Sequence, residues 1–383
     1  MKKTILLLCS LIASSQLGFS QVEYKVLESE KLQTKRELKI QLPRNYKSNV
    51  KKSYPLVLVF DGDYLFEPVA GNVDYYSYWE DMPEALVVGI NQSKTRMDDT
   101  KYDLENYLPV DQGADFFEFI GEELLPLLEK NYRISNFRIV VGHDLTANLM
   151  NYYLLKENPI FDGYINLSAD YTDVIKNNLP GILSKSKEKV WYYIATGTDD
   201  AELLKESNLQ MINSLKEIEN EKLYFYDDNF EEATHYSLVG RAIPKAIEDI
   251  FSVYRPITSK DYQEKVLKTK GTFYNYLVDK YEVIQKLYEL DIKIRVSDFM
   301  TISSAIEEKK EFEQYEDLGK LAQKEHPESM IGSYFLARYN EELGKPKRAL
   351  KEYQEAFSLN EASYLTKDMM IEKINSLKAD LGL

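Results

Sequence analysis

Short apolar runs alternate with amphipathic helical patterns up to residue 254, and this alternation constrains the fold more than any other feature. The apolar runs cover residues 56–60, 85–90, 138–141, 163–167, 190–195 and 222–226. Helices are predicted between most of them, including residues 114–128, 145–156, 201–218 and 238–254. Runs of this kind are typical of a mainly parallel sheet covered on both faces by helices. Residues 23–32 and 35–42 alternate in polarity, which predicts an antiparallel pair at the edge of this α/β sheet.

The pattern changes after Arg255-Pro256, where helical periodicity continues with few strand-like runs. We therefore expect one domain over residues 21–255 and a second, all-α domain over residues 256–383. The spacing that indicates a tetratricopeptide-like helix pair is carried by Leu336, Ala337, Gly344, Ala349, Tyr353 and Ala356. Such helices bind protein partners or brace the domain beside them, and the sequence leaves both roles open.

The first twenty residues have the pattern of a secretory signal peptide. Lys2 and Lys3 precede an apolar run over residues 5–17, and small residues follow at Gly18 and Ser20. We expect cleavage near Ser20 and export to the periplasm or cell envelope. A membrane anchor is disfavoured because the run is too short to span a bilayer, and lipid attachment at Cys9 is a further alternative. No transmembrane segment is predicted in the mature chain.

Composition limits the partners that the chain can take. The formal net charge is −15, and no basic cluster stands out, so nucleic acid and anionic membrane surfaces are not expected partners. Cys9 is the single cysteine, which leaves the mature chain without disulfides. No cofactor and no metal site are predicted. The 30 tyrosines are compatible with a surface for sugars or aromatic ligands, although they also serve as core and interface residues.

The segment Gly142-His143-Asp144-Leu145-Thr146 lies between a predicted strand and a predicted helix. This is the place where α/β-hydrolases present a catalytic serine in the pattern G-x-S-x-G. Here Asp144 replaces the serine and Thr146 replaces the second glycine. A carboxylate has no hydroxyl for a base to deprotonate, and its charge opposes a developing oxyanion. Because a β-branched residue is unfavourable in so tight a turn, we expect the turn to be relaxed.

Candidates for an acid and a base follow in the order that α/β-hydrolases use. Asp199 and Asp200 come after the apolar run at residues 190–195, and His235 comes after the run at residues 222–226. We expect these loops to meet at one edge of the sheet, with the Asp144 carboxylate within hydrogen-bonding reach of His235.

Three further segments carry a resemblance to a known family. Residues 54–63, 87–91 and 96–100 are similar to the putative esterase family, which includes ferric-siderophore esterases and feruloyl-esterase-like enzymes. The resemblance covers about residues 22–254 and implies the α/β-hydrolase fold. It implies that Asp144 stands at the nucleophile position and His235 at the base position. The acid is then Asp199 or Asp200, and the backbone N–H groups of Leu145 and of a residue near Gly62 are the oxyanion donors.

Two classes of function remain open. In the first, the protein is a pseudo-esterase that binds a small-molecule ester, a siderophore or a glycan in its cleft, or a protein through its C-terminal helices. In the second, it is an active hydrolase. Gly142-His143-Asp144 is also similar to the elbow of haloalkane dehalogenases and epoxide hydrolases, in which an aspartate attacks saturated carbon. Those enzymes use a helical cap domain, for which residues 169–189 are too few, so the C-terminal helices would have to take its place.

Overall fold

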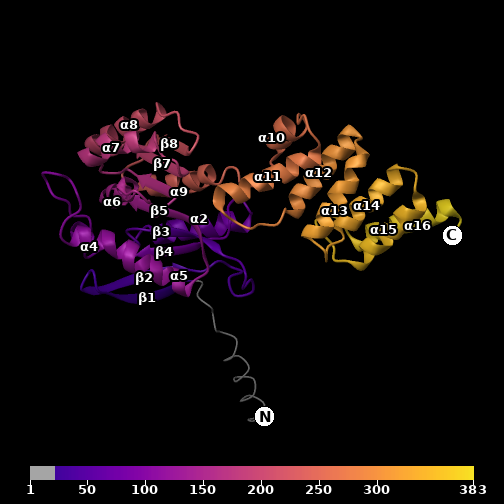
Figure 1. Ribbon diagram of the computed structural model, residues 1–383, viewed down its shortest axis with the longest axis horizontal. Helices are drawn as coiled ribbons and strands as arrows, with labels where there is room; N and C mark the ends of the chain where they lie inside the picture. Colours follow the sequence, from indigo (N-terminus) through magenta and orange to yellow (C-terminus); the bar gives the residue numbers. More distant parts are fainter. Residues whose placement is uncertain (1–21) are drawn as a thin grey trace, which may run out of the picture. The chain divides into compact units, whose positions relative to one another are not determined.

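The computed structural model describes residues 22–383 and divides into two compact units (Figure 1). The first unit ends at Ile250, and the second spans Phe251–Leu383. This division falls a few residues before the boundary expected at Arg255-Pro256. The predicted signal peptide, residues 1–20, lies outside the described residues, so its assignment stays a prediction.

The first unit is built on one eight-stranded sheet in the order β1-β2-β4-β3-β5-β6-β7-β8. Its strands are β1 (Val22–Ser29), β2 (Thr34–Gln41), β3 (Tyr54–Val59), β4 (Leu86–Ile90), β5 (Ile134–His143), β6 (Gly163–Leu167), β7 (Val190–Gly197) and β8 (Leu223–Phe230). Strands β1 and β2 form the expected antiparallel pair at one edge, and β2 is antiparallel to β4. The remaining pairs are parallel. The predicted α/β fold with a mainly parallel sheet is therefore confirmed.

Helices cover both faces of this sheet. They are α2 (Phe66–Tyr78), α3 (Arg96–Asp99), α4 (Gln112–Phe119), η1 (Ile120–Leu124), α5 (Leu125–Asn131), α6 (Leu145–Asn151), η2 (Tyr152–Leu155), α7 (Asp173–Leu183), α8 (Glu202–Lys216) and α9 (Ser237–Ile250). Helices α2 and α9 pack on each other and on β4, β6 and β7. The larger core, which contains Leu56 and Leu58 of β3, is filled from the other face by residues of α4 to α8. Because side chains alternate along a strand, Val57 and Val59 face the α2 and α9 side.

Two predicted helices are interrupted. The helix expected at residues 114–128 passes through a π-helical turn, η1, which contains Gly121. The helix expected at residues 145–156 tightens into a 3-10 turn, η2, after Asn151. Neither interruption changes the apolar periodicity of the sequence, so the pattern predicted the helices without predicting where they deform. Both turns line the same cavity, which is described below.

The second unit is helical throughout its described elements. These are α10 (Ser259–Asp261), η3 (Tyr262–Val266), α11 (Phe273–Tyr288), α12 (Val296–Lys309), η4 (Phe312–Gln314), α13 (Tyr315–Glu325), α14 (Ile331–Glu342), α15 (Pro346–Ser358) and α16 (Lys367–Leu381). Helices α13 to α16 pack successively on one another around their own apolar core. The helix pair expected around Gly344 is present as α14 and α15, while its tetratricopeptide assignment stays a prediction. Within residues 22–383, no helix has the length and apolar character needed to span a bilayer.

Candidate active site

Asp144 stands at the apex of the turn that joins β5 to α6. Its backbone has φ 57° and ψ −118°, a conformation that is strained for any residue with a Cβ atom. The tightness of the turn explains Gly142, because a Cβ at that position would lie 2.7 Å from the backbone nitrogen of Ala147. The Asp144 N–H donates to the Leu167 carbonyl of the neighbouring strand at 3.1 Å. The structure therefore has the strand–turn–helix that the sequence predicts.

The expectation that Thr146 relaxes this turn is wrong. The positive φ of Asp144 is kept, and Thr146 is fully buried inside the turn. Its hydroxyl accepts a hydrogen bond from the His143 N–H at 3.0 Å and donates to the Asp61 carboxylate at 2.7 Å. Thr146 thus fits the turn because its polar atom joins the surrounding network, which the steric argument from sequence did not include.

The Asp144 carboxylate is held by an arginine. Arg96 Nη1 donates to Asp144 Oδ2 at 3.1 Å, and the same guanidinium binds Asp61 through Nε and Nη2 at 2.8 and 3.2 Å. A fourth bond runs from Nη2 to the His143 carbonyl at 2.8 Å. Asp61 is buried, while the Arg96 and Asp144 side chains are 23% and 21% exposed. Arg96 therefore forms a partly exposed ion pair with Asp144, the residue at the nucleophile position.

A second arginine fixes the short helix α3, on which Arg96 lies. Arg36 of β2 makes two hydrogen bonds of 2.9 Å to the carboxylate of Asp99, and both side chains are buried. Thr95 Oγ1 and Gln92 Nε2 also donate to this carboxylate, at 2.8 and 3.2 Å. Gln112 of α4 donates to the same carboxylate at 2.9 Å, so Asp99 ties α3 to both β2 and α4. The Arg36–Asp99 pair is thus a positioning element for Arg96.

His235 and Asp200 are paired as the chain order predicts. His235 Nδ1 lies 3.0 Å from Asp200 Oδ1, and the Asp200 side chain is buried. Asp199, the other acid candidate, accepts a weak bond from Thr198 instead. The sequence did not point to Ser168, whose hydroxyl donates to Asp200 and lies 3.3 Å from the same imidazole nitrogen. Ser168 is fully buried beside Nδ1, so it orients the acid and the imidazole.

The predicted contact between Asp144 and His235 is absent. Among residues 22–383, no hydrogen bond or ion pair joins these two side chains, because the Asp144 carboxylate is bound by Arg96. Their loops nevertheless meet at His143. The Nε2 atom of His143 lies 3.1 Å from the His235 carbonyl, and the two imidazole rings are 4.2 Å apart. The strand ends are brought together, while the carboxylate turns to the arginine.

His143 has a defined tautomer in this network. A carbonyl can only accept, so Nε2 carries the proton that bonds to the His235 carbonyl, and Nδ1 then accepts from the Tyr64 hydroxyl at 2.9 Å. Burial first, and then the nearby His235, lower the pKa of His143 to about 4. Burial also raises the pKa of the Asp61 carboxyl, against the opposing effect of Arg96. The network therefore depends on a neutral imidazole.

This pKa predicts an acid-dependent loss of stability. An unfolded histidine takes up its proton near pH 6.5 and folded His143 near pH 4, so its contribution is complete above pH 6.5 and is lost as the pH falls towards 4. We expect the difference in unfolding free energy between wild type and His143→Gln to be about 2 kcal/mol smaller at pH 5 than at pH 7. Urea unfolding of both proteins at the two pH values measures it. A difference that does not change with pH would contradict a neutral, buried His143.

The two positions proposed as oxyanion donors differ in availability. Leu145 is the first residue of α6, so its N–H has no partner within the helix. The Gly62 N–H donates to the Ile90 carbonyl at 2.7 Å and is therefore occupied. The next N–H, that of Asp63, makes no hydrogen bond to any residue in the described part of the chain. The Leu145 N–H is thus free, and the free N–H beside Gly62 is that of Asp63.

A metal site has no support in the described residues. No group of three or more His, Cys, Asp or Glu side chains in residues 22–383 is arranged to hold a metal ion. The carboxylates of the site are bound instead by the arginines and hydroxyls described above.

The sheet order, the elbow and the His235–Asp200 pair define an α/β-hydrolase-fold protein. The chain belongs to the esterase family, because the model of the family described as "Putative esterase" matches residues 29–237, more than half of its length. No curated protein sequence matches it.

Solved structures share this fold. An uncharacterised protein from Capnocytophaga ochracea is 26% identical, with a TM-score of 0.81 over 94% of this chain and 100% of that one. An IroE-like serine hydrolase from Shewanella oneidensis is 20% identical, with a TM-score of 0.61 over 79% and 99%. The siderophore hydrolase EstB from Aspergillus nidulans is 14% identical, with a TM-score of 0.51 over 61% and 95%. The likeness to the first protein includes the helical unit, since it covers nearly the whole of both chains.

Proposed function

We propose that this protein is an exported pseudo-esterase, which binds a small-molecule ester or its carboxylate product and does not hydrolyse it. One observation carries the proposal: the residue at the apex of the elbow is a carboxylate that is ion-paired with Arg96 at 3.1 Å. A serine hydrolase needs a hydroxyl that transfers its proton to the histidine. In residues 22–383 the hydroxyl that contacts His235 is that of Ser168, which lies on the Nδ1 side of the ring and donates its proton to Asp200. The charge of Asp144 is directed towards Arg96.

The retained groups support binding of a polar ligand. An arginine has five N–H donors, and four of those of Arg96 are used by Asp61, Asp144 and the His143 carbonyl. One Nη1 hydrogen is left for a ligand oxygen, and the Leu145 N–H offers a second donor. Arg96, Asp144 and His235 are each 21–23% exposed, so a ligand reaches them from solvent. An ester carbonyl or a carboxylate is an acceptor of the kind that these donors bind.

The second candidate is an active hydrolase. It is favoured by the His235–Asp200 pair, which is intact at 3.0 Å and would allow His235 to activate a water molecule. Direct attack by Asp144 is the less favoured route, since the hydrogen bond from Arg96 stabilises the ground state of that carboxylate. In both routes, replacing a residue of the site changes the rate of hydrolysis. A protein that only binds the ester shows no such change.

The test is the hydrolysis of 4-nitrophenyl acetate by wild type and by His235→Ala. We expect both proteins to release nitrophenol at the same low rate, because no activated hydroxyl is present. Binding is measured separately by titrating the wild type with N-(4-nitrophenyl)acetamide, because an amide bond resists hydrolysis more than an ester bond does. Robust hydrolysis that disappears in His235→Ala would replace the binding proposal by the second candidate.

A further inference from the structure

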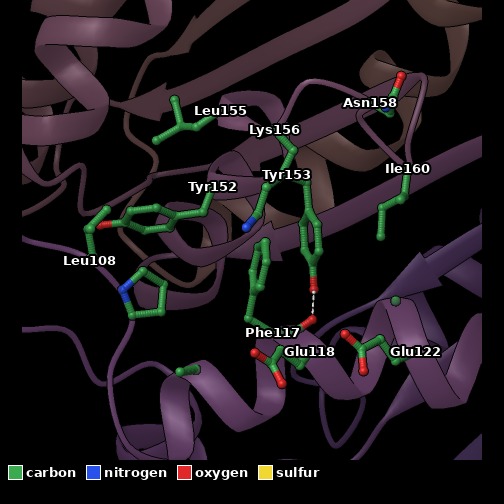
Figure 2. Close-up of a pocket in the computed structure, with 13 residues that line it drawn as sticks. Leu108, Phe117, Glu118, Glu122, Tyr152, Tyr153, Leu155, Lys156, Asn158 and Ile160 are labelled. Atoms are coloured by element: carbon green, nitrogen blue, oxygen red, sulfur yellow. Dashed lines mark hydrogen bonds between the residues drawn. The ribbon is translucent and has the colours of Figure 1, made fainter.

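A cavity of about 570 Å³ in the first unit is lined by residues of α4, η1 and η2 (Figure 2). Asp144 precedes the first residue of α6, and Tyr152 and Tyr153 follow its last residue. Seven helical residues span about 10 Å, so the cavity and the elbow are separated by the length of this helix. The residues that line the cavity include none of those that bind Asp144 or His235. The cavity is therefore a separate site, of a volume usual for small-molecule pockets.

Aromatic side chains form a fixed wall of this cavity. The rings of Phe117 and Tyr153 stack with centroids 4.1 Å apart and planes 14° apart. The Tyr153 hydroxyl donates to the Phe117 carbonyl at 2.8 Å, which holds η2 against α4, as the dashed line in Figure 2 shows. The Tyr152 hydroxyl bonds to Thr172 at 2.9 Å and to the Tyr107 carbonyl. These contacts hold the wall in place without a ligand, which lowers the ordering cost of binding.

The π-helical turn η1 contributes Gly121 and Glu122 to the lining of the cavity. Gly121 lies in this turn, and a Cβ at that position would meet no atom within 4 Å. Its backbone is in the ordinary helical range, because Gly121 is not among the glycines with positive φ. The absence of a side chain is thus not required by the backbone conformation or by close packing. It leaves space beside the aromatic wall.

The charged side chains around the cavity differ in whether they have an ion-pair partner. Glu118 and Glu122 both pair with Lys31, at 2.6 and 2.7 Å. Lys156 has no carboxylate within ion-pair distance among residues 22–383, and its ammonium lies 5.1 Å from the centroid of the Phe117 ring. Figure 2 shows its amine directed between Tyr152 and Phe117. Two carboxylates that are 49% and 61% exposed thus share one lysine, while Lys156, beside the aromatic wall, has no carboxylate partner in the described residues.

We propose that this cavity is a second binding site, which takes a small apolar carboxylate with an aromatic ring. The ring would lie against Phe117 and Tyr152, and the carboxylate would pair with the ammonium of Lys156. A cationic ligand at the aromatic wall would be repelled by the ammonium of Lys156, whereas the two glutamates that share Lys31 are exposed to solvent. This inference is independent of the proposed function, since no residue of the elbow takes part.

The proposal is tested with 1-naphthaleneacetate and the matched neutral alcohol 1-naphthaleneethanol, titrated into the full-length protein by calorimetry. We expect the wild type to bind the carboxylate about threefold to fivefold more tightly than the alcohol, as is usual for a partly exposed ion pair. Lys156→Gln should remove this preference and leave alcohol binding unchanged. Lys187→Gln, at an exposed lysine outside the cavity, should keep it. A preference that survives Lys156→Gln would overturn the assignment.

Gly121→Leu provides a second variant, which fills the cavity. It should weaken both ligands at least about tenfold, because a leucine side chain occupies the space beside the aromatic wall. Gly181→Leu is the matched control, since Gly181 is also a helical glycine with open space at its Cβ and does not line the cavity. Unchanged affinity in Gly121→Leu, equal losses in the two leucine variants, or no binding to the wild type would each contradict the proposal.

Discussion

Replacing Asp144 with serine should raise the hydrolysis of 4-nitrophenyl acetate at least about a hundredfold above the wild-type rate, the low end of what a positioned general base contributes. The replacement supplies the missing hydroxyl at a turn that already has the strained conformation of an elbow. His235 and Asp200 are paired, and the Leu145 N–H is free to bind an oxyanion. Arg96 keeps its bonds to Asp61 and to the His143 carbonyl. The rate is measured as kcat/KM beside wild type.

Matched variants separate the parts of this prediction. Adding Asp200→Asn to Asp144→Ser should remove the gain, whereas Asp199→Asn should leave it, because of these two acids it is Asp200 that is bonded to His235. Adding Thr146→Gly should lower the gain, since it deletes the bonds to the His143 N–H and to Asp61. If Thr146 relaxed the turn, as we expected from the sequence, adding Thr146→Gly would instead raise the gain. Equal rates for Asp144→Ser and wild type would mean that the site has lost more than its nucleophile.

Replacing Arg36 with leucine should lower the free energy of unfolding of the first unit by about 3–5 kcal/mol, the usual cost of removing one partner from a buried ion pair. Arg36 and Asp99 are 3% and 0% exposed, so the remaining carboxylate would be buried without its cation. The chain has two tryptophans, Trp79 and Trp191, and both belong to the first unit. Urea unfolding followed by tryptophan fluorescence therefore reports on this unit.

Lys35→Leu is the control for this substitution. Lys35 is the neighbour of Arg36 on β2, and its ion pair with Glu28 is exposed to solvent, so its loss should change stability little. We also expect Arg36→Leu to weaken ligand binding at the elbow, because α3 carries Arg96. Equal destabilisation by the two leucine variants would contradict the positioning role of the Arg36–Asp99 pair.

Local patterns predicted the frame of the site. Apolar runs gave the strands, and the glycine at residue 142 followed by a helix marked the turn at Asp144. His235 and Asp200 were found because each follows a strand in an order that the fold imposes. The sequence left Asp199 and Asp200 as alternatives. Adjacent residues lie at almost the same place in the fold and differ mainly in the direction of their side chains, which the sequence does not show. The hydrogen bond from His235 selects Asp200.

The partner of Asp144 was not predictable in the same way. Arg96 is 48 residues from Asp144, and which carboxylate an arginine contacts is decided by tertiary packing. A signal was present, since Asp61 and Arg96 lie in two of the segments that carry the family resemblance. Thr146 was misjudged because only its size was considered. Its hydroxyl satisfies buried polar groups, and this compensates for a β-branched side chain in the turn.

Labelling with an alkyl fluorophosphonate tests most directly whether the site has kept its machinery and lost only its nucleophile. An activated serine attacks phosphorus and expels fluoride, and intact-protein mass spectrometry followed by peptide mapping detects the adduct. We expect wild type to stay unlabelled, Asp144→Ser to be labelled at the introduced serine, and the addition of His235→Ala to prevent labelling. Labelling of wild type at any serine, including Ser168 beside His235, or an unlabelled Asp144→Ser protein would contradict this account.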